Sequence, residues 1–225
     1  MKTDPTRRAA LAVALIAALP APVLAQQAPA RAALAQAGDS ELTGAARTQA
    51  LTRASASLNR IRTLQGRFRQ IAPNGMATTG AFYMQRPGRL RFAYDPPQTM
   101  LIVADGSVVA VQDTALRTVN RAPLRSTPLY FVLKNDINLE RDARVTRVAQ
   151  RGDTLYVTAR DRTGSADGEI TFALVGANLD LQSWDVVDAM GARTRLSLSG
   201  LTRPASLDAR LFRAPAPTQT GPRRG

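Results

Sequence analysis

The sequence predicts an α+β fold in which a single curved antiparallel sheet of about eleven strands forms an unclosed β-barrel, with short helices over its open face. Short segments in which apolar and polar residues alternate recur along the chain, as expected for the strands of a half-buried sheet. Turn-forming pairs such as Asn74-Gly75 and Asp105-Gly106 separate these segments. Only two segments have helical character. The helices are expected either to plug the sheet as a packed core or to cover a cavity.

The first helical segment begins at about residue 45. Apolar residues recur there at intervals of three and four positions, on a stripe that the arginines avoid. The stripe consists of Leu51, Ala54, Leu58, Ile61 and Leu64, and the arginines off it are Arg53, Arg60 and Arg62. A stripe of this kind most often marks a helix that packs on a core.

Six strands are expected next, at about residues 66–71, 80–87, 90–94, 99–103, 107–111 and 115–120. The alternation is sharpest in the second and third of them. One face of these two strands carries Gly80, Phe82, Met84, Leu90, Phe92 and Tyr94, and the other face of the third carries Arg89 and Arg91. The apolar face is expected to point inward and the two arginines outward into solvent.

The second helical segment lies between residues 126 and 139, where Thr127 can cap a helix and Pro128 can occupy its first position. Five more strands are expected after it, at about residues 143–148, 154–161, 169–175, 179–188 and 193–201. Turns that contain Gly or Asn separate these strands. With no parallel crossover in this order, one antiparallel sheet accounts for all of the strands.

The first 25 residues have the features of a secretory signal peptide. Lys2, Arg7 and Arg8 precede an apolar run, and the cleavage pattern Val23-Leu24-Ala25 follows it. The run is shorter than the roughly 20 residues that a membrane span needs, and without a cysteine no lipid anchor can form at the cleavage site. We expect export to the periplasm, by the general secretory route rather than the twin-arginine route, and a soluble mature chain from Gln26.

The two ends of the mature chain differ in composition from its middle. Residues 26–44 are rich in Ala and Gln and are expected to form a mobile leader. Residues 216–225 are rich in Pro and Arg and are expected to form a disordered basic tail. The folded domain is expected to span residues 45–215.

The composition excludes most classes of enzyme. The chain has no cysteine and no histidine, which removes thiolate nucleophiles, the usual general base and the commonest metal ligands. No motif fixes two carboxylates as an acid and base pair, so no catalytic residue, metal or cofactor is predicted. The net charge is +13, and it becomes +11 when residues 1–25, with three basic residues and one acidic residue, are removed. Export argues against nucleic acid as a partner, and a general preference for Arg and Ala codons explains the charge equally well.

Several motifs together resemble the LolA family of periplasmic lipoprotein carriers, over about Leu58 to Pro215. The most specific is Gly80-x-Phe82-x-x-x-Arg86-Pro87-x-x-x-Arg91-x-x-Tyr94-x-x-Pro97. The others, in chain order, are Leu64-x-Gly66-x-Phe68-x-Gln70, Asp105-Gly106, Thr127-Pro128-Leu129, Trp184-x-Val186-x-Asp188-x-x-Gly191-x-x-Thr194-x-Leu196-x-Leu198 and Leu211-Phe212-x-x-Pro215. Each motif is weak alone, but their fixed order is specific.

The resemblance implies a barrel lined with apolar side chains, with short helices as its lid, that accepts the acyl chains of a lipoprotein and catalyses no reaction. The residues expected to line the lipid-binding cavity are Phe68, Phe82, Met84, Leu90, Phe92, Tyr94, Met100, Trp184, Val186 and Leu196. The residues expected to line the lid are Leu51, Leu58, Ile61, Leu129 and Val132.

Arg86 matches the family arginine that donates hydrogen bonds to carbonyls of the lid helices in the closed state. A guanidinium suits such a latch because it offers five fixed donors and keeps its charge. The other interpretation of Arg86 is a solvated arginine before a turn-forming proline.

The resemblance also implies partners. They are acylated lipoproteins as cargo, a lipoprotein-releasing ABC transporter of the inner membrane, and an acceptor at the outer membrane, either a receptor lipoprotein or the membrane itself. The protein is expected to act as a monomer that shuttles lipoproteins from the inner to the outer membrane. The alternative is a carrier of another envelope lipid, a glycolipid or phospholipid, on the same fold. A sensor with a second domain is less expected, because the segment after Pro215 is short and polar.

Overall fold

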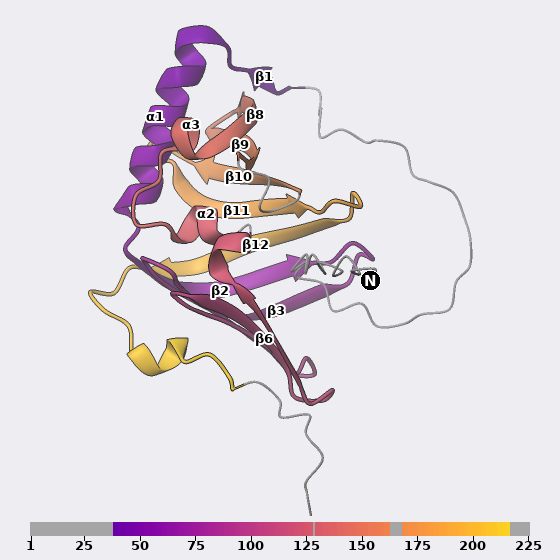
Figure 1. Cartoon of the computed structure of the whole chain (residues 1–225). Helices are drawn as coiled ribbons and strands as arrows, with labels where there is room; N and C mark the ends of the chain where they lie inside the picture. Colours follow the sequence, from indigo (N-terminus) through magenta and orange to yellow (C-terminus); the bar gives the residue numbers. More distant parts are fainter. Residues whose placement is uncertain (1–37, 128, 163–167, 217–225) are drawn as a thin grey trace, which may run out of the picture.

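Twelve antiparallel strands form one sheet within residues 38–127, 129–162 and 168–216, which are the residues that this computed structural model describes (Figure 1). The strands lie in the order β1-β8-β9-β10-β11-β12-β2-β3-β4-β5-β6-β7. Their bounds are β1 Ser40–Glu41, β2 Thr63–Ile71, β3 Ala77–Gln85, β4 Arg89–Tyr94, β5 Met100–Asp105, β6 Val108–Asp113, β7 Thr118–Pro123, β8 Ala143–Arg151, β9 Thr154–Asp161, β10 Glu169–Val175, β11 Asp180–Val187 and β12 Arg193–Thr202. Since β1 and β7 are the two ends of this order, the barrel is unclosed, as predicted.

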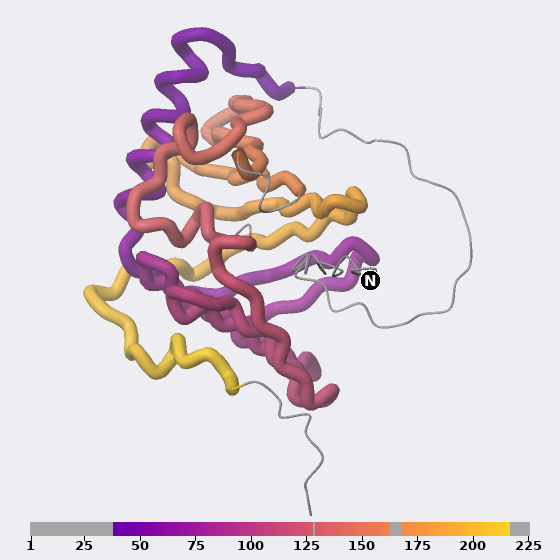
Figure 2. The backbone as a smooth tube through the Cα atoms, viewed as in Figure 1, coloured from indigo at the N-terminus to yellow at the C-terminus, as the bar shows by residue number. Residues whose placement is uncertain are grey.

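Three helices lie together on one side of the sheet (Figures 1 and 2). They are α1 (Gly44–Arg60), α2 (Leu129–Leu133) and α3 (Leu139–Asp142), and two 3₁₀ turns, η1 (Leu124–Ser126) and η2 (Ala209–Phe212), follow β7 and β12. Among the described residues, no helix is long and apolar enough to cross a membrane.

The alternation of apolar residues sets the register of the central strands. Phe82 pairs with Phe92, and Met84 pairs with Leu90, in the antiparallel ladder between β3 and β4. All four side chains are buried on the face that the helices cover. Because residues two apart share a face of a strand, the sharp alternation in the sequence correctly identifies the inner face of these strands.

Gly80 gives the inner face of β3 its shape. A Cβ atom at this position would lie 2.2 Å from the carbonyl oxygen of Ala93 and 2.4 Å from the ring of Phe68. The ring of Phe68 therefore occupies the space that a side chain at position 80 would take.

The structure corrects the prediction at the start of the domain. The described part of the expected leader forms β1, in which Ser40 pairs with Gln150 of β8. This adds a strand to the eleven expected, and α1 begins at Gly44. The helix also ends before Leu64, because the backbone is already extended at Ile61 and Leu64 lies in β2.

Two further boundaries differ from the prediction. Strand β7 begins three residues later than expected, because the carboxylate of Asp113 accepts hydrogen bonds from the amides of Ala115 and Leu116 and holds them in a turn. The second helical segment is divided into η1, α2 and α3. The side chain of Thr127 bonds back to the carbonyl of Leu124 instead of capping a helix, and Pro128 lies outside the described residues.

Candidate functional site

The side chain of Arg86 lies at the centre of the contact between the helices and the sheet. Arg86 follows β3, and only 6% of its surface is exposed. Its Nε donates a hydrogen bond of 2.7 Å to the carbonyl of Lys134, to which its Nη2 also donates. Nη2 lies 3.2 Å from the carbonyl oxygen of Asn135, and Nη1 donates to the carbonyls of Leu58 and Ile61. The solvated alternative for Arg86 is therefore wrong.

These carbonyls belong to the ends of two different helices. Leu58 and Ile61 lie at the carboxyl end of α1, and Lys134 and Asn135 directly follow α2. Carbonyls at the carboxyl end of a helix lack intrahelical donors and carry the negative end of the helix dipole. One guanidinium therefore satisfies both helix ends and connects them to β3.

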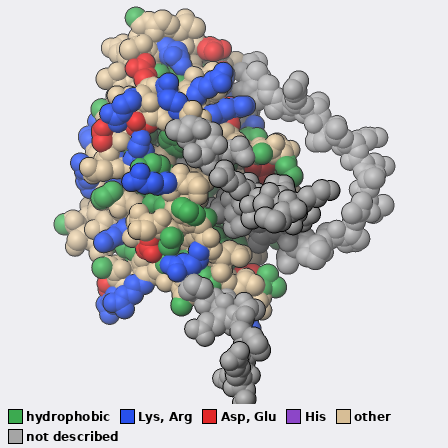
Figure 3. Space-filling view, in the orientation of Figure 1, with side chains coloured by type: hydrophobic (Ala, Val, Ile, Leu, Met, Phe, Trp, Pro, Cys, Tyr) green, Lys and Arg blue, Asp and Glu red, His purple; other side chains and the backbone are tan. Residues whose placement is uncertain are grey.

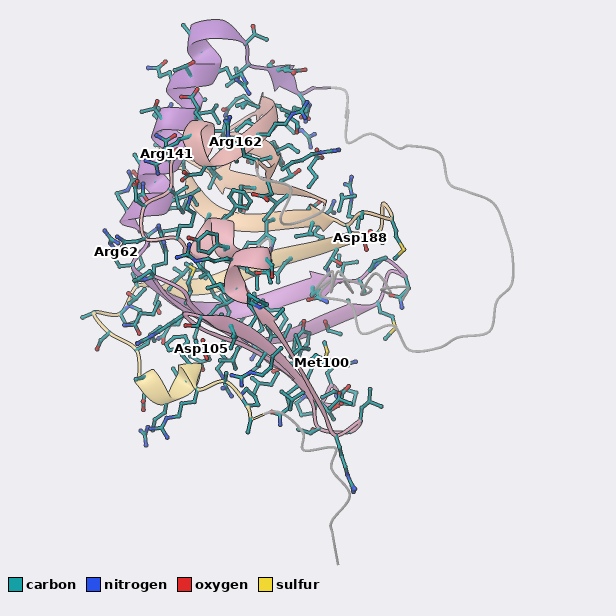
Figure 4. All side chains as sticks on the ribbon, viewed as in Figure 1. Arg62, Met100, Asp105, Arg141, Arg162 and Asp188 are labelled. Carbon is teal, nitrogen blue, oxygen red and sulfur yellow. The ribbon has the colours of Figure 1, made fainter. Side chains whose placement is uncertain are left out.

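Arg86 stays charged in this position. Burial lowers its pKa to about 10, the nearby charge of Arg62 contributes to the decrease, and Asp136 opposes it. Figure 4 shows Arg62 at the end of α1. Because the pKa remains well above 7, Arg86 donates charge-assisted hydrogen bonds to neutral carbonyls at neutral pH.

Asn59 is a member of this cluster that the sequence analysis did not identify. Its Oδ1 accepts hydrogen bonds from Nη2 of Arg86 at 3.2 Å and from the amide of Ile137 at 2.9 Å. Its Nδ2 donates to the carbonyl of Ile137 at 2.8 Å. The sequence did contain one signal: asparagine is a poor residue for the last turn of a helix unless its side chain bonds elsewhere.

The turn between β3 and β4 also supports α2 through its backbone. The amide of Gly88 donates to the carbonyl of Leu133 at 2.8 Å, and the amide of Arg86 donates to the carbonyl of Arg62 at the same distance. Lys134, the residue directly after α2, forms an ion pair of 2.8 Å with Asp142 of α3. The position of α2 therefore depends on polar contacts made at its carboxyl end.

The ten residues predicted to line a cavity lie together on the inner face of the sheet. All of them belong to the main hydrophobic cluster or pack against it; Met100 and Val186 are partly buried, and the others are buried. Five are aromatic, with ring centroids 4.9 to 6.4 Å apart in the contacting pairs: Phe68, Phe82, Phe92, Tyr94 and Trp184. This wall is apolar apart from the indole N–H of Trp184 and the hydroxyl of Tyr94, which donates to Gln70 at 2.7 Å.

The five residues predicted to line the lid belong to the same hydrophobic cluster. Leu51 and Leu58 come from α1, Leu129 and Val132 from α2, and Ile61 from the segment after α1. All five are buried. The structure thus brings the two predicted sets into one apolar interior; that this interior binds lipid is still a prediction.

The outer face of β8 to β12 has a different chemistry. It carries a groove of about 620 Å³ in which charged side chains are paired. Arg147 and Arg151 both pair with Asp39, and Arg195 pairs with Asp185. Hydrogen bonds from Arg151 and Arg147 hold the pKa of Asp39 below its usual range. A groove in which carboxylates balance the arginines does not suit an acyl chain.

Across the described residues, no three metal-ligating side chains form a group that suits a metal ion.

Comparison with known sequences identifies one family. The family model described as outer membrane lipoprotein carrier protein LolA matches residues 59–215. An outer-membrane lipoprotein carrier protein from Methylibium petroleiphilum is 31% identical over 179 residues, which cover 75% of this chain and 86% of the relative. One from Leptothrix cholodnii is 32% identical over 145 residues, covering 62% and 66%. The solved structure of a LolA superfamily protein from Nitrosomonas europaea has a TM-score of 0.42 at 12% identity, covering 72% of this chain and 97% of that one.

Proposed function

Because this chain belongs to the LolA family of outer membrane lipoprotein carrier proteins, we propose that it takes acylated lipoproteins from the inner membrane and carries them through the periplasm to the outer membrane. The observation that carries this proposal is the position of Arg86. One buried guanidinium connects α1 and α2 to β3 above a continuous apolar interior. The described conformation is then the closed state, and opening of the helices exposes the acyl-binding surface.

An acyl carrier needs a closed state that opposes the binding of its cargo. Burial of an acyl chain of about 16 carbons contributes on the order of 10 kcal/mol, at roughly 0.8 kcal/mol per methylene. A carrier that bound its cargo this tightly with no opposing term would not release it. In the closed state, Leu129 and Val132 cover the surface that lipid would occupy. Closure of the empty protein therefore competes with loading and favours release.

The hydrogen bonds support an opening in which α2 moves and α1 stays in place. Independently of Arg86, α1 is attached to the turn between β10 and β11: the hydroxyl of Ser57 donates to the carbonyl of Leu179, and Nη2 of Arg60 donates to the carbonyl of Asn178, both at 2.7 Å. By contrast, α2 is short, and a backbone bond from the amide of Gly88, in the turn between β3 and β4, to the carbonyl of Leu133 attaches it to the rest of the described chain. In our proposal, loss of the Arg86 bonds releases α2 first and leaves α1 in place.

The route and the partners follow from the sequence features. We propose cleavage before Gln26, a periplasmic location, loading by an ABC transporter of the inner membrane, and delivery to an acceptor at the outer membrane. Lys and Arg side chains are spread over the face that carries the helices (Figure 3), so the partner surfaces are expected to be acidic. Intact-mass measurement on envelope extracts should show loss of residues 1–25; a full-length chain held in the membrane would contradict this route.

Two measurements on the purified mature protein test the proposal. An apolar fluorescent probe should bind, and triacylated lipoprotein should displace it. Mass spectrometry of lipids that remain bound after gentle purification distinguishes the cargo classes. Acylated protein supports the proposal, whereas glycolipid or phospholipid alone would favour a carrier of another envelope lipid. Failure of every acylated ligand to displace the probe would reject an acyl-binding interior.

A further inference from the structure

A small apolar groove lies at the end of α1, where the apolar interior reaches the surface. Its volume is about 260 Å³, and it is lined by Ile61, Leu64, Asp180, Leu181, Leu201 and Arg203. Of these six residues, four are apolar. They come from the segment after α1, from β2, from the start of β11 and from the end of β12. The groove is therefore built from segments that are distant in sequence.

An irregularity of β12 directs Leu201 to this site. The pairing of β12 with β2 shifts in register between Ser199 and Thr202, and Gly200 has a φ of +58°. Glycine suits this backbone conformation because it has no Cβ. Opposite the irregularity, a Cβ on Gly66 would lie 2.6 Å from the carbonyl oxygen of Ser199 and 3.0 Å from Leu201. The bulge and the missing side chain together shape the wall of the groove.

The groove combines an apolar interior with a charged mouth. Ile61, Leu64 and Leu181 belong to the main hydrophobic cluster, and Leu201 packs against it. Arg203 and Asp180 form an ion pair of 2.5 Å, and about half of each side chain is exposed. An acyl chain with a polar head has the same distribution of chemistry, because its chain needs apolar walls and its head needs water or a charge.

We propose that this groove binds the terminal part of one fatty-acyl chain while Arg86 still holds the helices closed, an inference that rests on the proposed carrier function. A volume of about 260 Å³ holds roughly eight methylene groups, if each takes about the 30 Å³ of a water molecule. The site is coupled to the latch through Ile61. Its side chain lines the groove, and its carbonyl accepts a hydrogen bond of 3.3 Å from Arg86.

Photolabelling tests this site directly. The probe is palmitic acid with a diazirine at its methyl end, added to the purified mature protein and irradiated. Trypsin does not cleave between Arg86 and Pro87, so it releases residues 63–67, which contain Leu64 of the groove, separately from residues 70–89, which contain Phe82 and Met84 of the inner face. We expect labelling of residues 63–67 in the wild type. Leu201→Trp should fill the groove and reduce this labelling at least fivefold.

The matched control is Leu116→Trp, which places the same side chain at a position that is 65% exposed in the turn before β7. It should leave the labelling unchanged. Arg203→Glu is a second variant, chosen because about half of the side chain of Arg203 is exposed. It should reduce severalfold the labelling by decanoic acid with a diazirine at its methyl end, because about eight methylene groups in the groove place the carboxylate of this shorter chain at the mouth. It should not affect labelling by the corresponding methyl ester.

The outcomes separate this inference from the proposed function. Labelling of residues 70–89 without labelling of residues 63–67 overturns the groove and leaves the carrier function standing. Labelling of residues 63–67 that persists in both Leu201→Trp and Arg203→Glu also overturns it. Labelling of the groove with none of residues 70–89, even in Arg86→Leu, supports the groove and rejects the acyl-binding interior. If neither of the two peptides is labelled, both the groove and the acyl-binding interior are rejected.

Discussion

Arg86 and Asn59 are joined by a hydrogen bond of 3.2 Å between Nη2 of the arginine and Oδ1 of the asparagine. The same oxygen accepts from the amide of Ile137, and the asparagine amide donates back to the carbonyl of that residue. Asn59 therefore connects the last turn of α1, the segment that follows α2 and the guanidinium in one network. Members of such a network are expected to be coupled energetically.

Asn59→Ala tests this coupling. The substitution leaves the amide and carbonyl of Ile137 without their side-chain partner and removes one of the three acceptors of Nη2 of Arg86, which should cost about 1–3 kcal/mol. Amide hydrogen exchange of residues 129–138 should become faster, and α1 should be affected less because Ser57 and Arg60 still hold it. Asn135→Ala is the matched control, since the side chain of Asn135 accepts only an exposed bond from Arg62. Equal exchange in the two variants would show that Asn59 is not part of the latch.

Leu90→Glu tests the inner face of β4. Leu90 is buried in the apolar interior, and an unpaired carboxylate buried there costs several kcal/mol. We expect this variant to lose binding of the apolar probe. Arg89→Glu places the same side chain on the exposed face of the same strand and should bind normally. Circular dichroism of both variants separates loss of binding from loss of folding, and a folded Leu90→Glu protein with normal loading would place the acyl site elsewhere.

The pairing of Asp142 predicts that the fold loses stability in acid. Burial raises the pKa of its carboxyl, but hydrogen bonds from Arg141 and Lys134 outweigh this and hold the pKa well below its usual range. Because the pKa is lower in the folded protein than in the unfolded chain, the carboxylate stabilises the fold fully above about pH 4. That stabilisation is lost as the pH falls further toward the folded-state pKa.

Urea unfolding between pH 7 and pH 2.5 measures this effect. The difference in unfolding free energy between the wild type and Asp142→Asn should be constant from pH 7 to about pH 5 and should shrink below about pH 4. A difference for Asp142→Asn that stays constant down to pH 2.5 would mean that the charged carboxylate, paired with Arg141 and Lys134, does not stabilise the fold.

The sequence predicted the strands and the inner face well because these depend on a local period of two residues. It placed Phe82, Met84, Leu90 and Phe92 on one buried face, as found. It missed β1, since two residues become a strand only by pairing with Gln150 and Ala149 more than 100 positions away. No local pattern carries that information.

The site was predictable only in part, for the same reason. Arg86 was identified by its place in a family motif; its local sequence alone favours a solvated arginine before a turn. Its partners are backbone carbonyls, which every residue has, so no residue type marks Lys134 or Leu58 as acceptors. The groove at Leu201 depends on a register shift between β12 and β2, and a register is a property of two strands, not of one sequence segment.

In the proposed cycle, Arg86 holds the lid closed and thereby drives release of the cargo. Arg86→Leu removes hydrogen bonds to the ends of both helices, each worth about 1.5–3 kcal/mol before any compensation. The open state should gain population, so loading should be at least as good as in the wild type, while delivery should fail. Arg86→Lys keeps the charge but lacks the planar fork that spans several carbonyls, and it should be partly functional.

The most direct measurement follows a radiolabelled lipoprotein from inner-membrane vesicles to the soluble carrier and then to an acceptor membrane. We predict that Arg86→Leu takes up the lipoprotein from the vesicles, keeps it, and transfers little of it to the acceptor, with Arg86→Lys between this variant and the wild type. Normal transfer to the acceptor by a folded Arg86→Leu protein would contradict the account.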